Sequence, residues 1–221
     1  MILVLLAVFT VGYTQAQQNK QVAGSKNLEV LFAPLGGSPI GIGGIKYRSF
    51  SSETSAFRVT VFVGLQSDKG IDQVFDNADA LIDLTNKNGQ FNISVRPGIE
   101  KHFTGTDKLS PYVGGELLLG FSSEKQTDDL YDEDEDKVYE STQKDGSLTF
   151  GLNAVAGVDY YFAQNIYLGA EFGFGFAFDK MSDTKFDNTQ KNGPPSASVP
   201  NGSSISVGPN AVGQIRLGWL F

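Results

Sequence analysis

The stretch Ser147-Leu-Thr-Phe-Gly-Leu-Asn-Ala-Val-Ala-Gly-Val-Asp-Tyr-Tyr-Phe162 alternates two kinds of side chain. Its even positions, from Leu148 to Phe162, are all apolar, whereas its odd positions include Ser147, Asn153 and Asp159. A period of two residues is typical of a β-strand whose two faces meet different surroundings. The stretch therefore predicts a long strand with one apolar face and one polar face.

The same alternation recurs along most of the chain from residue 26 onward. The other alternating segments are 27–34, 40–50, 56–66, 90–103, 111–123, 166–179 and 204–221. Within 40–50 the phase slips at Gly43-Gly44, which predicts a β-bulge or kink. Together with 147–162, these segments predict eight strands.

The connections between these strands differ in length. Three of them are short, namely 51–55, 105–110 and 163–165. Apart from a tight first link at 36–39, those at the other end are long and polar, namely 67–89, 124–146 and 180–203. Short turns at one end and long loops at the other are typical of outer-membrane barrels. We therefore expect an all-β fold, an eight-stranded antiparallel up-and-down transmembrane β-barrel with both termini at the short-turn end.

The N-terminus has a different character. Residues 1–13 are almost wholly apolar, but a transmembrane helix needs about 20 such residues. The run is followed by Thr14-Gln15-Ala16, a small-x-small cleavage pattern. We expect a cleaved signal peptide over 1–17, a short tether over 18–26 and the barrel over 27–221. One feature departs from the usual signal-peptide pattern, because no positive charge precedes the apolar run. The alternative to a signal peptide is a buried first strand or core helix.

Composition excludes several classes of protein. The chain has 17 Lys and Arg against 25 Asp and Glu, a net charge of −8, which argues against nucleic acid as a partner. It has no Cys, which excludes disulfide scaffolds, thiolate metal sites, a Cys nucleophile and a lipoprotein anchor. His102 is the single histidine, so no metal site can use two imidazoles.

The apolar face is expected to meet lipid. A soluble ligand-binding barrel would turn this face inward, but aromatic residues near both strand ends favour the opposite arrangement, since membrane barrels carry two aromatic girdles. Near the short turns are Phe57, Phe103, Phe162, Trp219 and Phe221; near the long loops are Phe32, Phe91, Phe121, Phe150 and Phe178.

The opposite, inward face carries equal numbers of cations and anions. They are Lys46, Arg48, Arg58, Arg96 and Arg216, and Glu29, Glu100, Glu116, Asp159 and Glu171. An eight-stranded barrel is just wide enough for its side chains to fill the interior. Because an unpaired buried charge costs several kcal/mol, the balance predicts a salt-bridged interior network. Isolated charges near the strand ends are the alternative.

Three segments resemble the outer-membrane β-barrel domain family, which includes OmpA-like, OmpX-like and opacity-type small barrels. They are Ala156-Gly-Val-Asp-Tyr-Tyr-Phe162, Asn165-Ile-Tyr-Leu-Gly-Ala-Glu171 and Pro111-Tyr-Val-Gly-Gly-Glu116. The last two also belong to an internal repeat, Tyr112–Phe121 and Tyr167–Phe176. The C-terminal residues 214–221 resemble the assembly signal of such barrels, which assigns that role to Trp219 and Phe221.

The resemblance implies location in the outer membrane of a Gram-negative bacterium. The implied partners are outer-membrane lipid and lipopolysaccharide, the barrel-assembly machinery and an envelope protein complex. Two functions stay open: a structural or interaction role, adhesin-like or as a subunit, and a narrow porin-like channel for small solutes.

An enzyme is not expected, because small-barrel enzymes keep a catalytic His near the extracellular rim and alternation places His102 at the opposite end. We therefore assign no catalytic residue and no cofactor. Asp132, Asp134 and Asp136 have the spacing of a calcium loop, but Lys137 replaces its Gly and Gln143 its final Glu. A solvated acidic loop is the alternative to a cation site.

Overall fold

The computed structural model describes residues 20–32, 42–132, 137–190, 195–209 and 214–221. All elements of regular secondary structure in these residues are β-strands. The strands are β1 (Lys26–Phe32), β2 (Ile42–Ser52), β3 (Ser55–Phe75), β4 (Leu81–His102), β5 (Leu109–Asp132), β6 (Lys137–Ala163), β7 (Ile166–Met181), β8 (Thr184–Asn188), β9 (Ala197–Val199), β10 (Ser203–Gly208) and β11 (Gln214–Leu220). In these residues no helix is long and apolar enough to cross a membrane.

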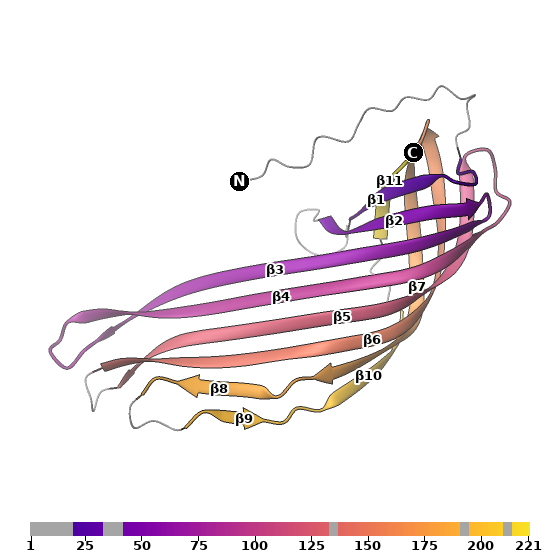
Figure 1. The fold of residues 1–221 in the computed structure, drawn as a ribbon. Helices are drawn as coiled ribbons and strands as arrows, with labels where there is room; N and C mark the ends of the chain where they lie inside the picture. The colour runs from indigo at the N-terminus through magenta and orange to yellow at the C-terminus, as the bar shows by residue number, and fades with distance from the viewer. Residues whose placement is uncertain (1–19, 33–41, 133–136, 191–194, 210–213) are drawn as a thin grey trace.

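Eight strands close into a ring. Successive strands from β1 to β7 pair antiparallel, β7 pairs with β11, and β11 pairs with β1. Figure 1 shows this ring beside the C-terminus, which lies with the short turns. Within the ring, pairing on both sides satisfies the backbone groups of each strand, as a bilayer requires. The predicted fold class, an all-β antiparallel barrel of eight strands, is confirmed.

Two local irregularities adjust the register. Leu31 lies opposite Gly44 and Phe32 opposite Ile42, so Gly43 is the extra residue and the predicted bulge is confirmed. The last strand, expected as one segment over 204–221, is two strands, because β10 pairs with the outer half of β7 and β11 with its inner half. The register shifts by two residues between them, so odd-numbered residues face outward in both.

The prediction that 67–89 and 124–146 are loops was wrong. Strand β3 pairs with β4 as far as Phe75 and Leu81, and β5 pairs with β6 as far as Asp132 and Lys137. The polar composition of these segments suggested loops, but antiparallel pairing tolerates polar residues where both faces meet water. Segment 180–203 likewise contains β8 and β9, which extend the edge of β6.

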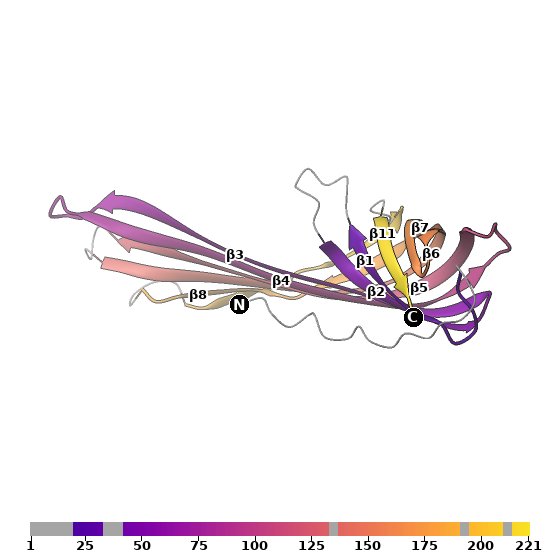
Figure 2. The same cartoon turned by 90° about the horizontal axis from the view of Figure 1, so that it is seen from above.

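These extensions form a six-stranded open sheet that projects far beyond the ring (Figures 1 and 2). We call it the hairpin arm. It comprises residues 66–90, 123–132 and 137–146, together with β8 and β9.

The ring is apolar outside and polar inside. Outward residues such as Phe57, Phe121 and Phe150 are exposed, as predicted for a lipid-facing surface. Most buried side chains of the ring are instead polar or charged, and its apolar cluster is limited to Phe50, Ala56 and Leu220. The distribution is the inverse of that in a soluble protein, which is what a lipid-facing barrel needs.

Candidate functional site

The barrel interior is the candidate site, and each of the eight ring strands supplies at least one charged residue to it. They are Glu29 from β1, Lys46 and Arg48 from β2, Arg58 from β3, Arg96 and Glu100 from β4, Glu116 from β5, Asp159 from β6, Glu171 from β7 and Arg216 from β11. The side chain of Arg96 is 23% exposed; the other nine are 9% exposed or less. Strand alternation alone brings these residues together, because each occupies an inward position of its strand.

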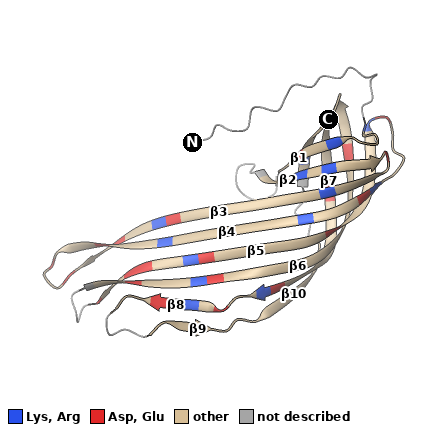
Figure 3. Ribbon diagram, in the orientation of Figure 1, with Lys and Arg blue, Asp and Glu red and all other residues tan. Residues whose placement is uncertain are grey.

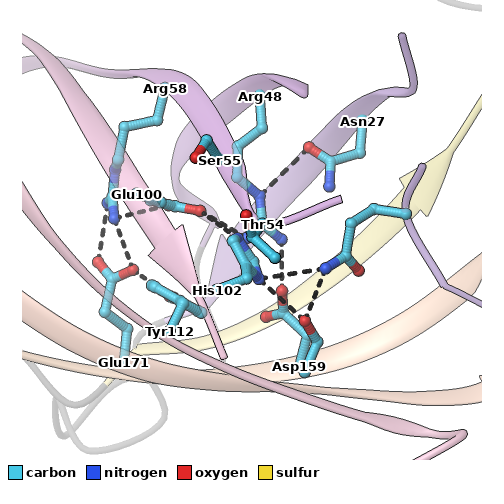
Figure 4. Close-up of polar contacts among 12 residues, drawn as sticks. Asn27, Arg48, Thr54, Ser55, Arg58, Glu100, His102, Tyr112, Asp159 and Glu171 are labelled. Atoms are coloured by element: carbon cyan, nitrogen blue, oxygen red, sulfur yellow. Dashed lines mark hydrogen bonds and ion pairs between the residues drawn. The ribbon is translucent and has the colours of Figure 1, made fainter. Parts of the chain in front are cut away.

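Arg48 lies at the centre of this set and is fully buried. Its Nε is 2.6 Å from Glu29 Oε1, its Nη1 is 2.9 Å from Glu100 Oε2, and its Nη2 is 2.7 Å from Asp159 Oδ2. The planar guanidinium thus holds carboxylates from three strands, which its fork of donors suits better than an ammonium would. Figure 4 shows Arg48 pointing toward Asp159.

Two more cations continue the network on either side of Arg48. Arg216 Nη1 lies 2.8 Å from Glu29 Oε2, and its Nη2 lies 2.9 Å from Asp159 Oδ1. Arg58 Nη1 lies 2.9 Å from Glu100 Oε1. Three carboxylates are therefore shared between Arg48 and a second arginine, so the pairs form one connected network.

Glu171 and Glu116 join the remaining two cations, Lys46 and Arg96, to this network. Glu171 accepts from Arg58 Nη2 at 2.8 Å and from Lys46 Nζ at 2.9 Å. Glu116 Oε2 lies 3.1 Å from Arg58 Nη2, and Arg96 reaches Glu116 at 3.7 Å. All ten predicted interior residues thus make at least one ion pair with another member of the set.

Three buried tyrosines, Tyr112, Tyr161 and Tyr167, complete the interior, and sequence reasoning did not assign them to the site. Tyr112 donates a hydrogen bond to Glu171, and Tyr167 donates one to Glu29 at 2.9 Å. Arg48 Cζ lies 5.6 Å from the Tyr112 ring centroid and 5.3 Å from that of Tyr167, within cation–π range. The internal repeat could have indicated that Tyr112 and Tyr167 point inward. Each copy of the repeat opens with a tyrosine four residues before an inward glutamate, so the two side chains lie on the same face of the strand.

Inward glycines make the space that these rings occupy. A Cβ at Gly157 would collide with the Tyr112 phenol, and one at Gly218 would collide with the Tyr167 ring. The high glycine content therefore has a packing reason at these positions, since large aromatic rings need small residues opposite them.

The short-turn end of the barrel is closed by the segment that was expected to be a tether. Gln21 is buried; its Nε2 donates to Ser110 Oγ at 2.8 Å, and its Oε1 accepts from the Tyr161 hydroxyl at 3.0 Å. Gly24, at φ 86°, turns the chain into β1, and its N–H donates to the Phe50 carbonyl. The first described residues thus cover the mouth of the barrel.

His102 lies at this closed end, on the short-turn side where alternation placed it. Its Nδ1 is 2.9 Å from Ser110 Oγ and its Nε2 is 3.1 Å from Glu100 Oε2. A Ser, a His and a carboxylate in sequence are the parts of a hydrolytic triad. However, Ser110 is fully buried, Gln21 covers it, and Glu100 is held by two arginines. A substrate has no access to the Ser110 hydroxyl in this arrangement.

The other predicted sites lie elsewhere. Asp132 accepts a hydrogen bond from Gln190, whereas Asp134 and Asp136 lie outside the described residues. The described part of the chain contains no group of three or more His, Asp or Glu side chains arranged to hold a metal ion. Residues 1–19, where the signal peptide is expected, also lie outside the described ranges.

The C-terminal residues of the expected assembly signal complete the ring. Trp219 and Phe221 share the outward face, with ring centroids 5.5 Å apart. Phe221 N–H donates to the Lys26 carbonyl at 2.8 Å, and Lys26 N–H donates back to the Phe221 carbonyl at 2.9 Å. The last residue of the chain is therefore part of the seam that closes the barrel.

A closed antiparallel ring with an apolar exterior and a salt-bridged interior defines a small membrane β-barrel. Residues 81–185 match the model of the "Putative OmpA-OmpF-like porin family". The matched range runs from β4 to β8 and includes Glu100, Glu116, Asp159 and Glu171. The match supports an outer-membrane β-barrel of a porin-like family for this chain, which confirms the resemblance. A search of curated proteins found no match.

Proposed function

We propose that this protein is an outer-membrane barrel with a structural or interaction role, closed to solutes and able to offer the hairpin arm to a partner. The observation that carries the proposal is the complete burial of Arg48 and Arg216 between carboxylates of facing strands. Side chains that fill the cross-section of a barrel leave no continuous water path through it.

The proposal extends to location and partners. The family match suggests a bacterial outer membrane, and we place the protein in that of a Gram-negative cell. Its proposed partners there are outer-membrane lipid and lipopolysaccharide, the barrel-assembly machinery and, through the arm, an envelope protein complex. We assign it no catalytic role, because the buried Ser110 is closed off by Gln21.

The alternative function is a narrow channel for small solutes. It is favoured by the word "porin" in the name of the matched family. Planar-bilayer recording separates the two functions, because the closed barrel should give no conductance steps. Vesicles prepared with the same protein serve as the insertion control: protection of the barrel from added protease shows that the protein has inserted. Stable steps from the unaltered protein would instead establish the channel.

A charge-neutral variant makes silence interpretable. Replacing Arg58 and Glu171 together with Ala removes one cation and one anion that lie 2.8 Å apart and leaves the net charge unchanged. The shortened side chains should leave a water-filled gap. Combined with Gln21→Ala, which removes the side chain that closes the short-turn end, this variant should conduct in the same recordings. If it also stays silent after verified insertion, the network is not what closes the barrel.

A further inference from the structure

Five lysines point outward from the five consecutive strands β3 to β7. They are Lys69, Lys87, Lys125, Lys144 and Lys180, and all are exposed. We call this set the lysine belt. In Figure 3 the blue bands of β3, β4, β5 and β6 cross the sheet next to one another. The register agrees, because Lys69 lies directly opposite Lys87 and Lys125 directly opposite Lys144.

Four of these lysines follow the apolar outer surface of their strands in the same way. On the four strands β3 to β6, the run of apolar outward residues that begins in the ring ends with one residue that is followed by a small outward residue and then by the lysine. The four triplets are Leu65-Ser67-Lys69, Phe91-Gly89-Lys87, Phe121-Ser123-Lys125 and Leu148-Gly146-Lys144. On β7, Lys180 directly follows outward Phe178. Other apolar residues, Ile71, Phe75, Leu81 and Val138, lie farther out on the same face of the arm. The belt therefore lies where the apolar outer surface of the ring ends.

The belt also lies at a nearly constant height. Its lysines are 14, 15, 16, 19 and 14 residues from the short-turn ends of β3, β4, β5, β6 and β7. With a rise of about 3.3 Å per residue and a tilt of about 40°, these counts correspond to roughly 35–50 Å across the membrane. A bilayer with its headgroups is about 40–45 Å thick, so the lysines reach the far headgroup region.

Among the residues that the structure describes, four of the five belt lysines have no salt bridge to an anion. Like charges directly opposite one another on neighbouring strands are destabilising, yet Lys69 lies opposite Lys87, and Lys144 lies between Lys125 and Lys185 of β8. The fifth lysine, Lys144, has a salt bridge with Asp187, at 3.5 Å and half exposed. The nearby carboxylates of Asp68, Glu124 and Asp145 occupy the alternate, inward positions of their strands. An anion outside the protein would relieve this repulsion.

We propose that the lysine belt is a binding site for the phosphate groups of lipids in the leaflet that the hairpin arm leaves. The acyl chains would lie on the apolar surface, and the phosphates would lie between paired lysines, over the strip of small residues. The proposal rests on the membrane-barrel assignment but not on whether the barrel conducts, so its failure and that of the closed barrel are separable.

Binding of lipid to the folded full-length protein in detergent tests the proposal. Diphosphorylated lipid A is the probe, dephosphorylated lipid A of the same acyl composition is the comparison, and native mass spectrometry measures the bound fraction. The variant carries Lys69→Gln, Lys87→Gln and Lys125→Gln. Since a lysine near an anionic surface contributes about fivefold to affinity, the three substitutions should weaken binding of the diphosphorylated probe roughly 100-fold.

Two further variants make the result specific. Replacing the same lysines with Arg keeps the charges and should keep affinity within about threefold. Replacing Lys26, Lys101 and Lys108 at the short-turn end with Gln removes the same charge and should have a much smaller effect. An equal loss in this rim variant, or equal binding of dephosphorylated lipid A, would overturn the proposal. Displacement of the lipid by equimolar inorganic phosphate would also overturn it, because it would indicate a site for the free ion.

Discussion

The ring and the hairpin arm share four strands, β3 to β6, yet they are held together differently. In the ring, each strand has neighbours on both sides, and the inward charges are buried in a network centred on Arg48. In the arm, β3 beyond Val61 pairs only with β4, and its charged residues are exposed. The same alternation of polar and apolar residues therefore produces a rigid barrel where the sheet closes and a solvated sheet where it does not.

Charge separates the two regions as clearly as burial does. The segments 67–89, 124–146 and 180–203 contain 17 acidic and 8 basic residues, whereas the rest of the chain contains 8 acidic and 9 basic residues. The net negative charge of the protein thus belongs to the arm and its connections. The ring is close to neutral, as a structure with buried charges must be.

The largest expected effect concerns the seam that closes the ring. Replacing Trp219 and Phe221 with Ser should abolish most assembled barrel and leave aggregated or degraded chain, because β11 must pair with β1 and present an apolar face to lipid. Heat-modifiability on unboiled gels and outer-membrane fractionation measure the assembled fraction. The matched control replaces Asp134 and Asp136, which follow β5 in the sequence, with Asn. A terminal variant that assembles as well as this control would contradict the role of the seam.

The second effect tests the ring's network. Arg48→Met should lower the free energy of unfolding by about 3–5 kcal/mol, because it leaves three carboxylates without their shared partner. Arg96→Met is the control: this side chain is partly exposed and reaches Glu116 only at 3.7 Å, so about 1 kcal/mol or less is expected. Urea unfolding of the refolded protein in lipid gives both values. Equal losses would mean that the connected network stabilises the barrel no more than a single, partly exposed ion pair does.

Features of the ring and the arm that follow from neighbouring residues in the sequence could be predicted, whereas features that depend on pairing between distant strands could not. The inward positions of residues such as Arg58, Glu100 and Glu171 follow from strand period alone, so their side of the sheet could be assigned residue by residue. Which carboxylate meets which cation depends on register across the ring, and no local pattern encodes that.

Neither the hairpin arm nor the closure of the short-turn end by Gln21 could be predicted from the sequence, and the reasons differ. Polar hairpins such as Asp68–Lys87 look like loops because neither face is apolar, and pairing between strands is a tertiary property. Gln21 belongs to no periodic segment, so nothing near it in the sequence indicates that it enters the barrel. The inward positions of Tyr112 and Tyr167 could have been predicted, because each tyrosine shares a strand face with the glutamate four residues later in its copy of the repeat.

A smaller effect is expected when the arm is shortened. Lys69 and Lys87 are directly paired, so residues 69–87 can be replaced by Asn-Gly, which favours a two-residue hairpin turn. The ring should keep its heat-modifiability and its free energy of unfolding within about 1 kcal/mol, since distant sites contribute nearly independently. Urea unfolding in lipid measures this. A loss as large as that of Arg48→Met would show that arm and ring are one cooperative unit.

The smallest effect is a pH dependence confined to the arm. Asp145 accepts hydrogen bonds from Thr184 and Gln143, and these bonds lower the pKa of its carboxyl below the ordinary 3.8. A lowered pKa stabilises the folded arm above the ordinary value, and this contribution is lost as the pH falls through the folded pKa. Acidification from about pH 6 to below about pH 4 should therefore loosen the contact of β8 with β6, as measured by hydrogen exchange over 184–188. Asp187 of β8, which pairs with Lys144 and whose pKa is also lowered, titrates in the same range. In the double variant Asp145→Asn, Asp187→Asn, the exchange over 184–188 should therefore no longer change over this range, and the exchange of β11 should be unaffected in both proteins. Acid-induced exchange in β11 that matched the exchange in β8 would show that the arm does not respond separately from the ring.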